Sequence, residues 1–494
     1  MMQRKFLSNL FLLLFLNLMV KPFWVFGIDR TVQNVVGTGD YGLYFAIFNF
    51  SFLFNILLDM GISNFNNRNI AQNKQLIQKH FSRIIVLKVM LGGVYLLLTF
   101  LTAFFIGYDS LHFRFLAIIT FNQFLLSLLL YLRSNISGLL LFRTDSILSV
   151  MDRLLMILFV GILLWGDVLK TVFRIEYFIL AQTLAYIVTV FVAFVIVAKH
   201  SQFRLPKWDL PFYLLIIKKS APFALLILLM GIYARIDSVL LERLLPKSIG
   251  NNEAGIYAQG FRILDAANQI AFLFAVLLLP AFSYMIKQKE SISELVRISF
   301  NILFVVSTSF AIMTFFFSEE MILLLYPQQI GEESTHFQYR LEEAVQLFPF
   351  LMLAFVGYAS TYVFGTLLTA KGDLKSLNKI AFIGVIISLL LNVFLIPKYF
   401  ALGSAYANFA AQWVTAILQI YLAHRYFKFT INLRYLASLL IFVLLVGFAF
   451  YFVQRLDVLW YWKLFLGLAA AFVFSIGLKI VDVKEFYLIL LKKD

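Results

Sequence analysis

The chain has 494 residues, of which 62% are hydrophobic and only 14% are charged, and its mean hydropathy is +0.90. There are too few polar side chains to cover a soluble globule, so the composition predicts a polytopic membrane protein. Its apolar runs are continuous and lack strict alternation, which predicts an all-α fold. The net charge of +15 does not indicate nucleic-acid binding, because basic residues of such a chain normally gather in cytoplasmic loops. With no cysteine and only five histidines, no metal site or cofactor is expected.

Apolar runs of about 18 residues or more are long enough to cross roughly 30 Å of hydrocarbon as a helix. Fourteen such runs are expected to span the membrane: 6–28, 42–65, 82–107, 113–138, 146–166, 173–198, 217–241, 254–283, 297–317, 344–370, 376–396, 402–424, 433–453 and 459–480. The first run resembles a signal peptide, but Lys21 and Pro22 interrupt it and no small-x-small cleavage site follows. We therefore expect it to be retained as a helix.

The basic residues of the loops predict the orientation of these spans. With the N-terminus in the cytoplasm, about 26 lysines and arginines fall on the cytoplasmic side and about 10 on the outer side. Both termini are therefore expected to be cytoplasmic. The longest outer loop, 318–343, is acidic and is expected to be a solvated connection, because the outer side carries no requirement for positive charge.

The most basic and proline-punctuated loop, 199–220, is expected to link two bundles of six helices. The N-terminal lobe would cover 1–198 and the C-terminal lobe 221–424. Residues 425–494 would then hold helices 13 and 14 and a cytoplasmic tail.

A short internal repeat supports two equivalent halves. The segment VVGTGDYGLY near residue 35 resembles KSIGNNEAGIY near residue 247, at one offset of about 213 residues. The matched pairs are Gly37 with Gly250, Gly42 with Gly255 and Tyr44 with Tyr257. An even number of spans in each half inserts the two copies in the same sense, so the halves form a parallel pseudo-repeat.

Basic residues inside the spans are the first candidates for a site, because charge within hydrocarbon is costly. Five remain after the loops are assigned: Lys21, Lys88, Arg153, Arg235 and Arg262. At 1.5 Å per residue, Lys21, Arg235 and Arg262 fall near one level in the outer half of the bilayer, which predicts a shared cationic cavity. Lys88 and Arg153 lie nearer the cytoplasmic ends and are expected to reach the interface with their long side chains.

Aspartates near these cations leave an alternative open. Arg262 and Asp265 are three residues apart on a helix, so they can neutralise each other without any ligand. Arg235 and Asp237 point in different directions and cannot easily do so. Asp59, at the inner end of the second span, suits a helix-terminal hydrogen bond as well as ion handling.

No motif for catalysis was found: the sequence contains no GxSxG, HExxH or GxxxxGK[ST]. The chain is therefore not expected to be an enzyme or to hydrolyse ATP. A transporter of this kind would be a facilitator or would use an ion gradient.

Four stretches together carry a family resemblance: GDYGLYFAIFNFSFLFNILLDMGIS, YARIDSVLL, EAGIYAQGFRILDAANQIAFLFAVLLLPAFS, and LLTAKGDLKSLNKIAF followed by LLLNVFLIPKYFALGSAYAN. In this order they resemble the Wzx-type polysaccharide-repeat-unit (O-antigen) flippases of the multidrug/oligosaccharidyl-lipid/polysaccharide (MOP) superfamily. The resemblance implies fourteen helices in two six-helix lobes around a cationic cavity. It also implies export of polyprenyl-pyrophosphate-linked oligosaccharide across the bacterial inner membrane for lipopolysaccharide or other surface polysaccharide.

In such a flippase Lys21, Arg235 and Arg262 would attract the pyrophosphate or acidic sugars, and membrane lipid would surround the polyprenyl tail. Helices 13 and 14 would favour a lipid-linked substrate. Proton or sodium coupling would use Asp59, Asp237 or Asp265, and polysaccharide polymerase machinery would be a partner.

Two other functions stay open from the sequence. A multidrug or cation antiporter of the same superfamily predicts a cavity dominated by carboxylates. A membrane-embedded polysaccharide polymerase or ligase predicts a large outer loop rich in arginine and histidine, against which the acidic segment 318–343 argues.

Overall fold

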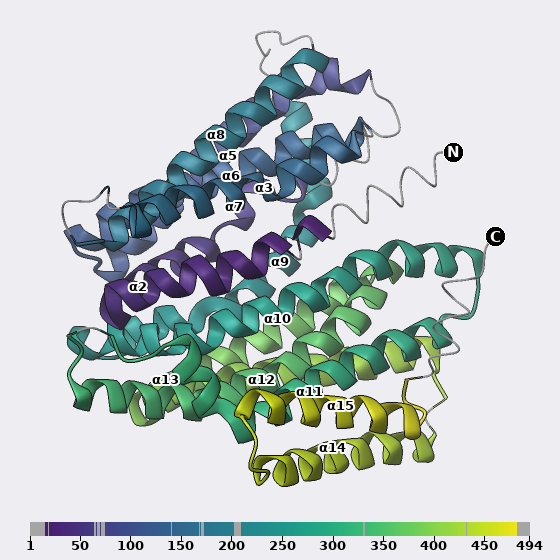
Figure 1. Ribbon diagram of the computed structural model, residues 1–494. Helices are drawn as coiled ribbons and strands as arrows, with labels where there is room; N and C mark the ends of the chain where they lie inside the picture. Colours follow the sequence, from purple (N-terminus) through teal and green to yellow (C-terminus); the bar gives the residue numbers. More distant parts are fainter. Residues whose placement is uncertain are drawn as a thin grey trace. The chain divides into compact units, whose positions relative to one another are not determined.

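A computed structural model describes residues 15–17, 19–63, 66, 70, 75–139, 141–166, 168, 172–201, 209–329, 331–430 and 432–481. The regular elements in these ranges are all helices (Figure 1). Ten of the described helices are long and apolar enough to cross a membrane, so the predicted all-α polytopic fold is confirmed. Parts of the first expected span, of the 199–220 linker and of the C-terminal tail lie outside the described residues.

The chain divides into two compact units, Met1–Gly255 and Ile256–Asp494. The first contains the short π-helix η1 (Trp24–Asp29), α2 (Arg30–Leu53), α3 (Ile56–Asp59), α5 (Leu76–Ile106), α6 (Ser110–Gly138), α7 (Phe142–Trp165), α8 (Ile175–His200) and α9 (Leu210–Leu244). Within it α6 packs against α8, and α2 packs against α9. The lobe boundaries expected from the sequence stay a prediction.

Helix α10 (Lys247–Gln288) begins in the first unit and continues into the second. The second unit also contains α11 (Ser293–Leu325), α12 (Ser334–Lys371), α13 (Leu374–Phe427), α14 (Leu433–Gln454) and α15 (Trp460–Gly477). Helix α13 joins two of the expected spans in one element, with a bend at Phe400 (φ 48°, ψ −129°) three residues after Pro397.

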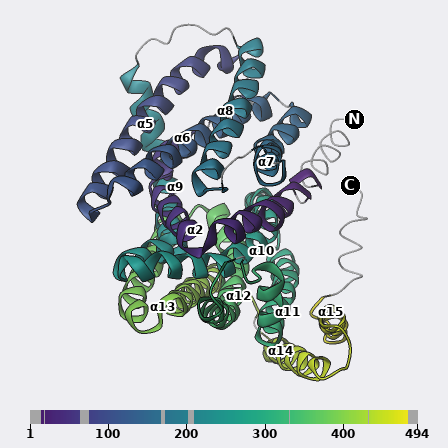
Figure 2. The same ribbon diagram turned by 60° about the vertical axis from the view of Figure 1, so that its left-hand side comes forward.

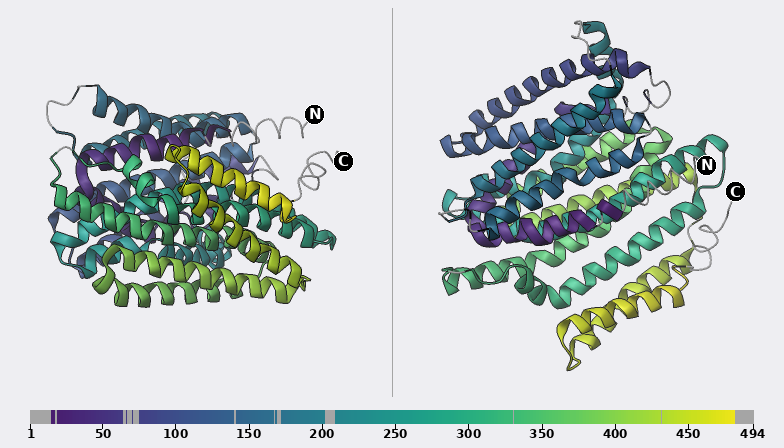
Figure 3. Two further views of the ribbon diagram at one scale, coloured as in Figure 1. Left: turned by 60° about the horizontal axis from the view of Figure 1, so that its bottom comes forward. Right: turned by 45° about the horizontal axis from the view of Figure 1, so that its top comes forward.

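The last two helices form a hairpin that packs against α11 (Figures 2 and 3). Their inner side chains, including Phe442, Phe450 and Ala471, join a core with α11 residues such as Phe317. Their outer faces expose large apolar side chains, with Leu433 81% exposed. A long helix with this exposure is stable only where lipid covers it, which agrees with a membrane location.

Much of the expected acidic outer loop is helical. Residues 318–325 end α11 and residues 334–343 begin α12, so only 326–333 connect the two helices. Arg340 lies fully buried there and donates to Glu332 Oε1 and Oε2, at 2.9 Å each, and to the carbonyls of Tyr326 and Pro327. The expectation of a wholly solvated loop is wrong, because this arginine ties the connection down.

Helix α2 and the segment after it are interrupted at three points. Gly37 has a positive φ of 84° and bends α2 near its start. A turn at Phe54 and Asn55 separates α2 from α3. Helix α3 then ends at Met60, which is left-handed (φ 46°), and Gly61 (φ 78°). The second expected span is therefore a discontinuous helix.

Two glycines of the predicted repeat meet inside the first unit. A Cβ added at Gly42 would lie 1.8 Å from the carbonyl oxygen of Asn251, and one at Gly255 would lie 2.1 Å from that of Thr38. The helices can approach this closely only because neither residue has a side chain. Gln33 Nε2 also donates to the Gly255 carbonyl, at 3.0 Å. Repeat-equivalent positions thus form one close helix crossing.

Candidate functional site in the first unit

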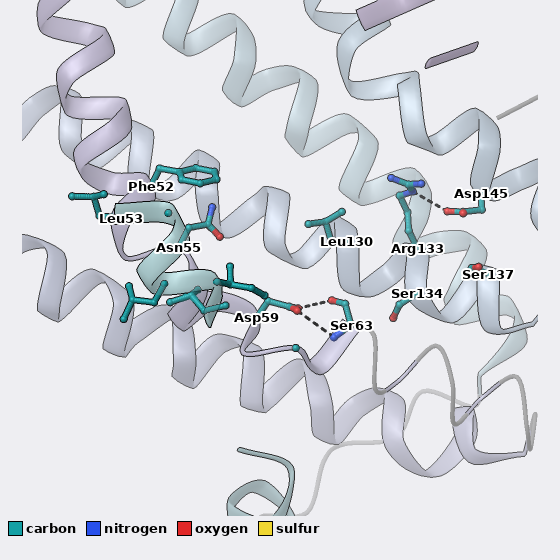
Figure 4. A pocket seen from close by; sticks show the side chains of 15 residues that line it. Phe52, Leu53, Asn55, Asp59, Ser63, Leu130, Arg133, Ser134, Ser137 and Asp145 are labelled. Atoms are coloured by element: carbon teal, nitrogen blue, oxygen red, sulfur yellow. Dashed lines mark hydrogen bonds and ion pairs between the residues drawn. The ribbon is translucent and has the colours of Figure 1, made fainter. Parts of the chain in front are cut away.

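A cavity of about 400 Å³ lies in the first unit beside the interrupted helix (Figure 4). Its lining comes from α2 and α3, from the C-terminal part of α6, from the first turns of α7 and from α9. Apolar side chains form part of the wall, and the polar groups are Asn55, Asp59, Ser63, Arg133, Ser134, Ser137 and Asp145. A mostly apolar cavity with a few converging polar groups is the usual form of a small-molecule site.

Arg133 is the cation in the cavity wall. Its Nε donates to Asp145 Oδ1 at 2.8 Å, and the two side chains are 21% and 13% exposed (Figure 4). Among the residues that the structure describes, the two terminal nitrogens of Arg133 donate no hydrogen bond. The planar guanidinium therefore keeps donors for an anionic ligand while Asp145 fixes its orientation.

Asp59 lies at the opposite wall and forms an ion pair with Lys88. The Lys88 ammonium also donates to Leu58 O and Ser127 Oγ, at 2.9 Å each. The side chain of Lys88 is only 1% exposed, so the expectation that it reaches the interface is wrong. Helix α3 ends beside α5, and its carbonyl and carboxylate hold the ammonium inside the bundle.

Arg235 lies next to the cavity without lining it. Its Nη1 donates to Asn49 Oδ1 at 3.2 Å, and its guanidinium lies 4.7 Å from the ring centre of Phe52, which does line the cavity. Asn49 in turn donates to Ser238 Oγ at 2.9 Å. Asp237 is fully buried two residues further along α9. Arg235 therefore belongs to the α2–α9 interface.

Lys21 lies in the described helical residues before η1, where the charges of Asp152, Arg153 and Arg133 act on it. Arg153 is 3.7 Å from Asp152, and its guanidinium lies 5.4 Å from the ring centre of Trp24. Lys21 thus lies near charges of α6 and α7, whereas Arg235 contacts α2.

Arg262 belongs to the second unit. Its Nη1 lies 3.9 Å from Asp265 Oδ2, and the two side chains are 15% and 23% exposed. This is the i,i+3 pairing that the sequence left open as an alternative to ligand binding. The roles predicted for Lys21, Arg235, Arg262, Asp59, Asp237 and Asp265 stay predictions.

Sequence reasoning missed Arg133 and Asp145 as site residues. Arg133 is one of the basic residues counted on the cytoplasmic side, although it lies within the expected span 113–138, which ends at the same residue as α6. The sequence shows only that an arginine and an aspartate stand near the ends of two consecutive helices. A separation of twelve residues across the turn between these helices does not by itself predict an ion pair.

Comparison with solved structures identifies the class of fold. The lipid II flippase MurJ in an inward closed conformation has a TM-score of 0.68 over 93% of this chain and 98% of its own, at 14% identity. An inward-facing multidrug resistance MATE family transporter of the MOP superfamily has a TM-score of 0.63 over 82% and 94%, at 14% identity. A MOP superfamily transporter from Pyrococcus furiosus, described as having a binding pocket of reversed polarity, has 0.56 over 85% and 93%, at 14% identity. The chain has the fold of a MOP superfamily transporter.

The sequence identifies the family itself. Residues 7–286, more than half of the chain, match the family described as polysaccharide biosynthesis protein, and the chain belongs to this family. No curated protein matches the chain.

Proposed function

We propose that the protein moves polyprenyl-pyrophosphate-linked oligosaccharide from the cytoplasmic to the outer leaflet of the bacterial inner membrane, for O-antigen, lipopolysaccharide or related surface polysaccharide. Membership of a polysaccharide biosynthesis family supports a glycan pathway. The fold shared with a lipid II flippase supports a lipid-linked cargo. The observation that carries the proposal is the cavity inside the first unit, where Arg133 keeps donors for an anion.

The physical problem of such transport explains why a cavity is needed. An unpaired pyrophosphate in hydrocarbon would cost many kcal/mol, so polar groups must replace its water. Arg133 would bind the pyrophosphate, and the Ser137 hydroxyl would donate to a phosphate or sugar oxygen. The hydroxyls of Ser63 and Ser134 already donate to Asp59 and to the Tyr131 carbonyl, so they would accept from sugar hydroxyl groups. The polyprenyl tail would stay in the lipid that covers the exposed apolar helix faces.

The other predicted cations, Lys21, Arg235 and Arg262, do not line the cavity, but they fit the same proposal as additional positive charges for the substrate. Lys21 adds positive charge that acts together with Arg133. Arg235 stacks on Phe52 and would reach the cavity by a change of side-chain rotamer. Arg262, in the second unit, would bind the anionic group at a later stage of transport, once its ion pair with Asp265 is broken. Transport would proceed by alternating access of one site to the two sides of the membrane.

The proposal includes a topology and partners. Both termini would be cytoplasmic, and Arg133 near the end of α6 would then lie on the side where the substrate is made. The protein would act as a transporter without catalysis, and polysaccharide polymerase machinery would use the delivered glycan.

Export in cells tests the role of Arg133. The variant Arg133→Ala should lose surface polysaccharide at unchanged protein level, whereas Arg133→Lys should keep part of the activity because it preserves the charge. Arg143→Ala is the matched control, since Arg143 is exposed at the start of α7. If Arg133→Ala exports as well as Arg143→Ala, the proposed anion site is wrong.

A second candidate function is a gradient-driven multidrug or cation antiporter. The carboxylates of Asp59 and Asp145 in the cavity wall and the similarity to a multidrug MATE transporter favour it. Against it, both carboxylates already have basic partners, Lys88 and Arg133. Unchanged drug sensitivity on deletion, together with lost surface polysaccharide, would exclude the antiporter.

A further inference from the structure

The end of α3 is a helix terminus inside a membrane protein. A helix end leaves carbonyl groups without partners in the helix, and hydrocarbon offers no water to replace them. The chain turns away at Met60, a left-handed residue without the freedom of glycine. This turn leaves Leu58 O and the Asp59 carboxylate facing α5 and α6, where Lys88 and Ser127 meet them.

The ammonium of Lys88 is fully used by the oxygen atoms at this end. It has three N–H donors and donates to Leu58 O, Ser127 Oγ and Asp59 Oδ1. Ser127 completes the set, because its hydroxyl donates to Leu58 O at 2.9 Å while its oxygen accepts from Lys88. Among the described residues, every N–H of this buried ammonium has an acceptor.

These oxygen atoms are of the kinds that hold a monovalent cation. Transporters bind sodium ions with carbonyls of unwound helix ends, together with oxygen-bearing side chains. Here one carbonyl, one hydroxyl and one carboxylate converge at a broken helix, and the positive charge comes from the chain itself. We infer that the break after α3 is a cation site permanently filled by the ammonium of Lys88.

The inference goes beyond the proposed function, because it holds for any cargo. It implies that Asp59 takes up no cation from solution, so ion coupling, where it occurs, uses other carboxylates. Asp59 is 25% exposed and lines the cavity, so a cation could reach it if the ammonium were removed.

Thermal unfolding of the purified full-length chain tests the inference. In Lys88→Ala the vacated site should bind a small cation, so sodium, potassium or methylammonium should raise the unfolding temperature by about 2 °C or more in a saturable way, relative to choline at equal ionic strength. Lys88→Met is the matched control, because its side chain fills the space without charge and should give no rise. Adding Asp59→Asn to Lys88→Ala should abolish the rise.

Two results would overturn the inference. The first is that Lys88→Ala folds and has the same unfolding temperature in sodium, potassium, methylammonium and choline salts. The second needs no Lys88 variant and applies even if Lys88→Ala does not fold. A sodium-dependent rise in the wild type that Asp59→Asn removes would mean that Asp59 binds sodium beside Lys88, whereas an equal sodium response in both proteins supports the filled site.

Discussion

The close crossing of Gly42 and Gly255 makes the sharpest stability prediction. A methyl group at Gly42 would lie 1.8 Å from Asn251 O and 2.7 Å from Gly255 N. Ordinary van der Waals contact begins near 3.4 Å, so the backbones would have to part by more than an ångström. Overpacking of this kind costs about 1–3 kcal/mol, and the parting would also weaken the hydrogen bond from Gln33.

The matched control is Gly93, a helical glycine of α5 at which an added Cβ would meet nothing within 4 Å. Alanine is the better helix former by about 1 kcal/mol, so Gly93→Ala should be neutral or stabilising. Gly42→Ala should instead lower the unfolding temperature of the purified protein. If Gly42→Ala unfolds at or above the temperature of Gly93→Ala, the crossing is not as close as described.

Three further predictions concern named charges. Glu332→Gln should destabilise the folded protein by about 3–5 kcal/mol, because it leaves the buried charge of Arg340 without its partner. Glu333 is exposed, so the control variant Glu333→Gln should change stability by less than about 0.5 kcal/mol. Thermal unfolding would measure both. Burial alone would raise the pKa of Glu332, but hydrogen bonds from Arg340 outweigh burial and lower the pKa. The stabilisation by the Glu332–Arg340 pair should therefore be complete above about pH 4.5 and be lost at lower pH. Denaturation at graded pH would measure this loss. Arg235→Ala should reduce glycan export about tenfold, with Arg235→Lys between it and wild type; equal export by all three proteins would contradict a role for this residue. Asp237→Asn should remove any gradient-dependent part of transport in proteoliposomes, and a retained gradient response would assign coupling elsewhere.

The class of protein and much of the helix order could be predicted from the sequence, because hydrocarbon imposes length and apolarity on each span. The repeat at Gly42 and Gly255 is also visible as a spacing, although nothing in that spacing predicts contact between the two glycines. The structure adds that contact. A helix-terminal hydrogen bond of Asp59 was one of the roles left open, but the break inside the span 42–65 and the partner Lys88 were not expected.

The errors come from charges whose partners are distant in sequence. Lys88 was expected to reach the interface because only its depth could be judged, whereas its acceptors come from α3 and α6. Arg133 was counted with the cytoplasmic basic residues because it lies near the inner end of its span, and its partner Asp145 comes from the next helix. Depth along one helix can be predicted from spacing, but the neighbour that satisfies a buried charge depends on tertiary packing.

Translocation by purified protein tests the central claim most directly. Proteoliposomes would carry a fluorescent polyprenyl-pyrophosphate glycan, and a membrane-impermeant quencher would report its movement between leaflets. The account predicts that wild-type protein accelerates this movement over empty liposomes, that Arg143→Ala does the same, and that Arg133→Ala lowers the rate about tenfold or more, as the loss of a charged hydrogen bond would. Wild-type rates equal to those of empty liposomes, or full activity of Arg133→Ala, would contradict it.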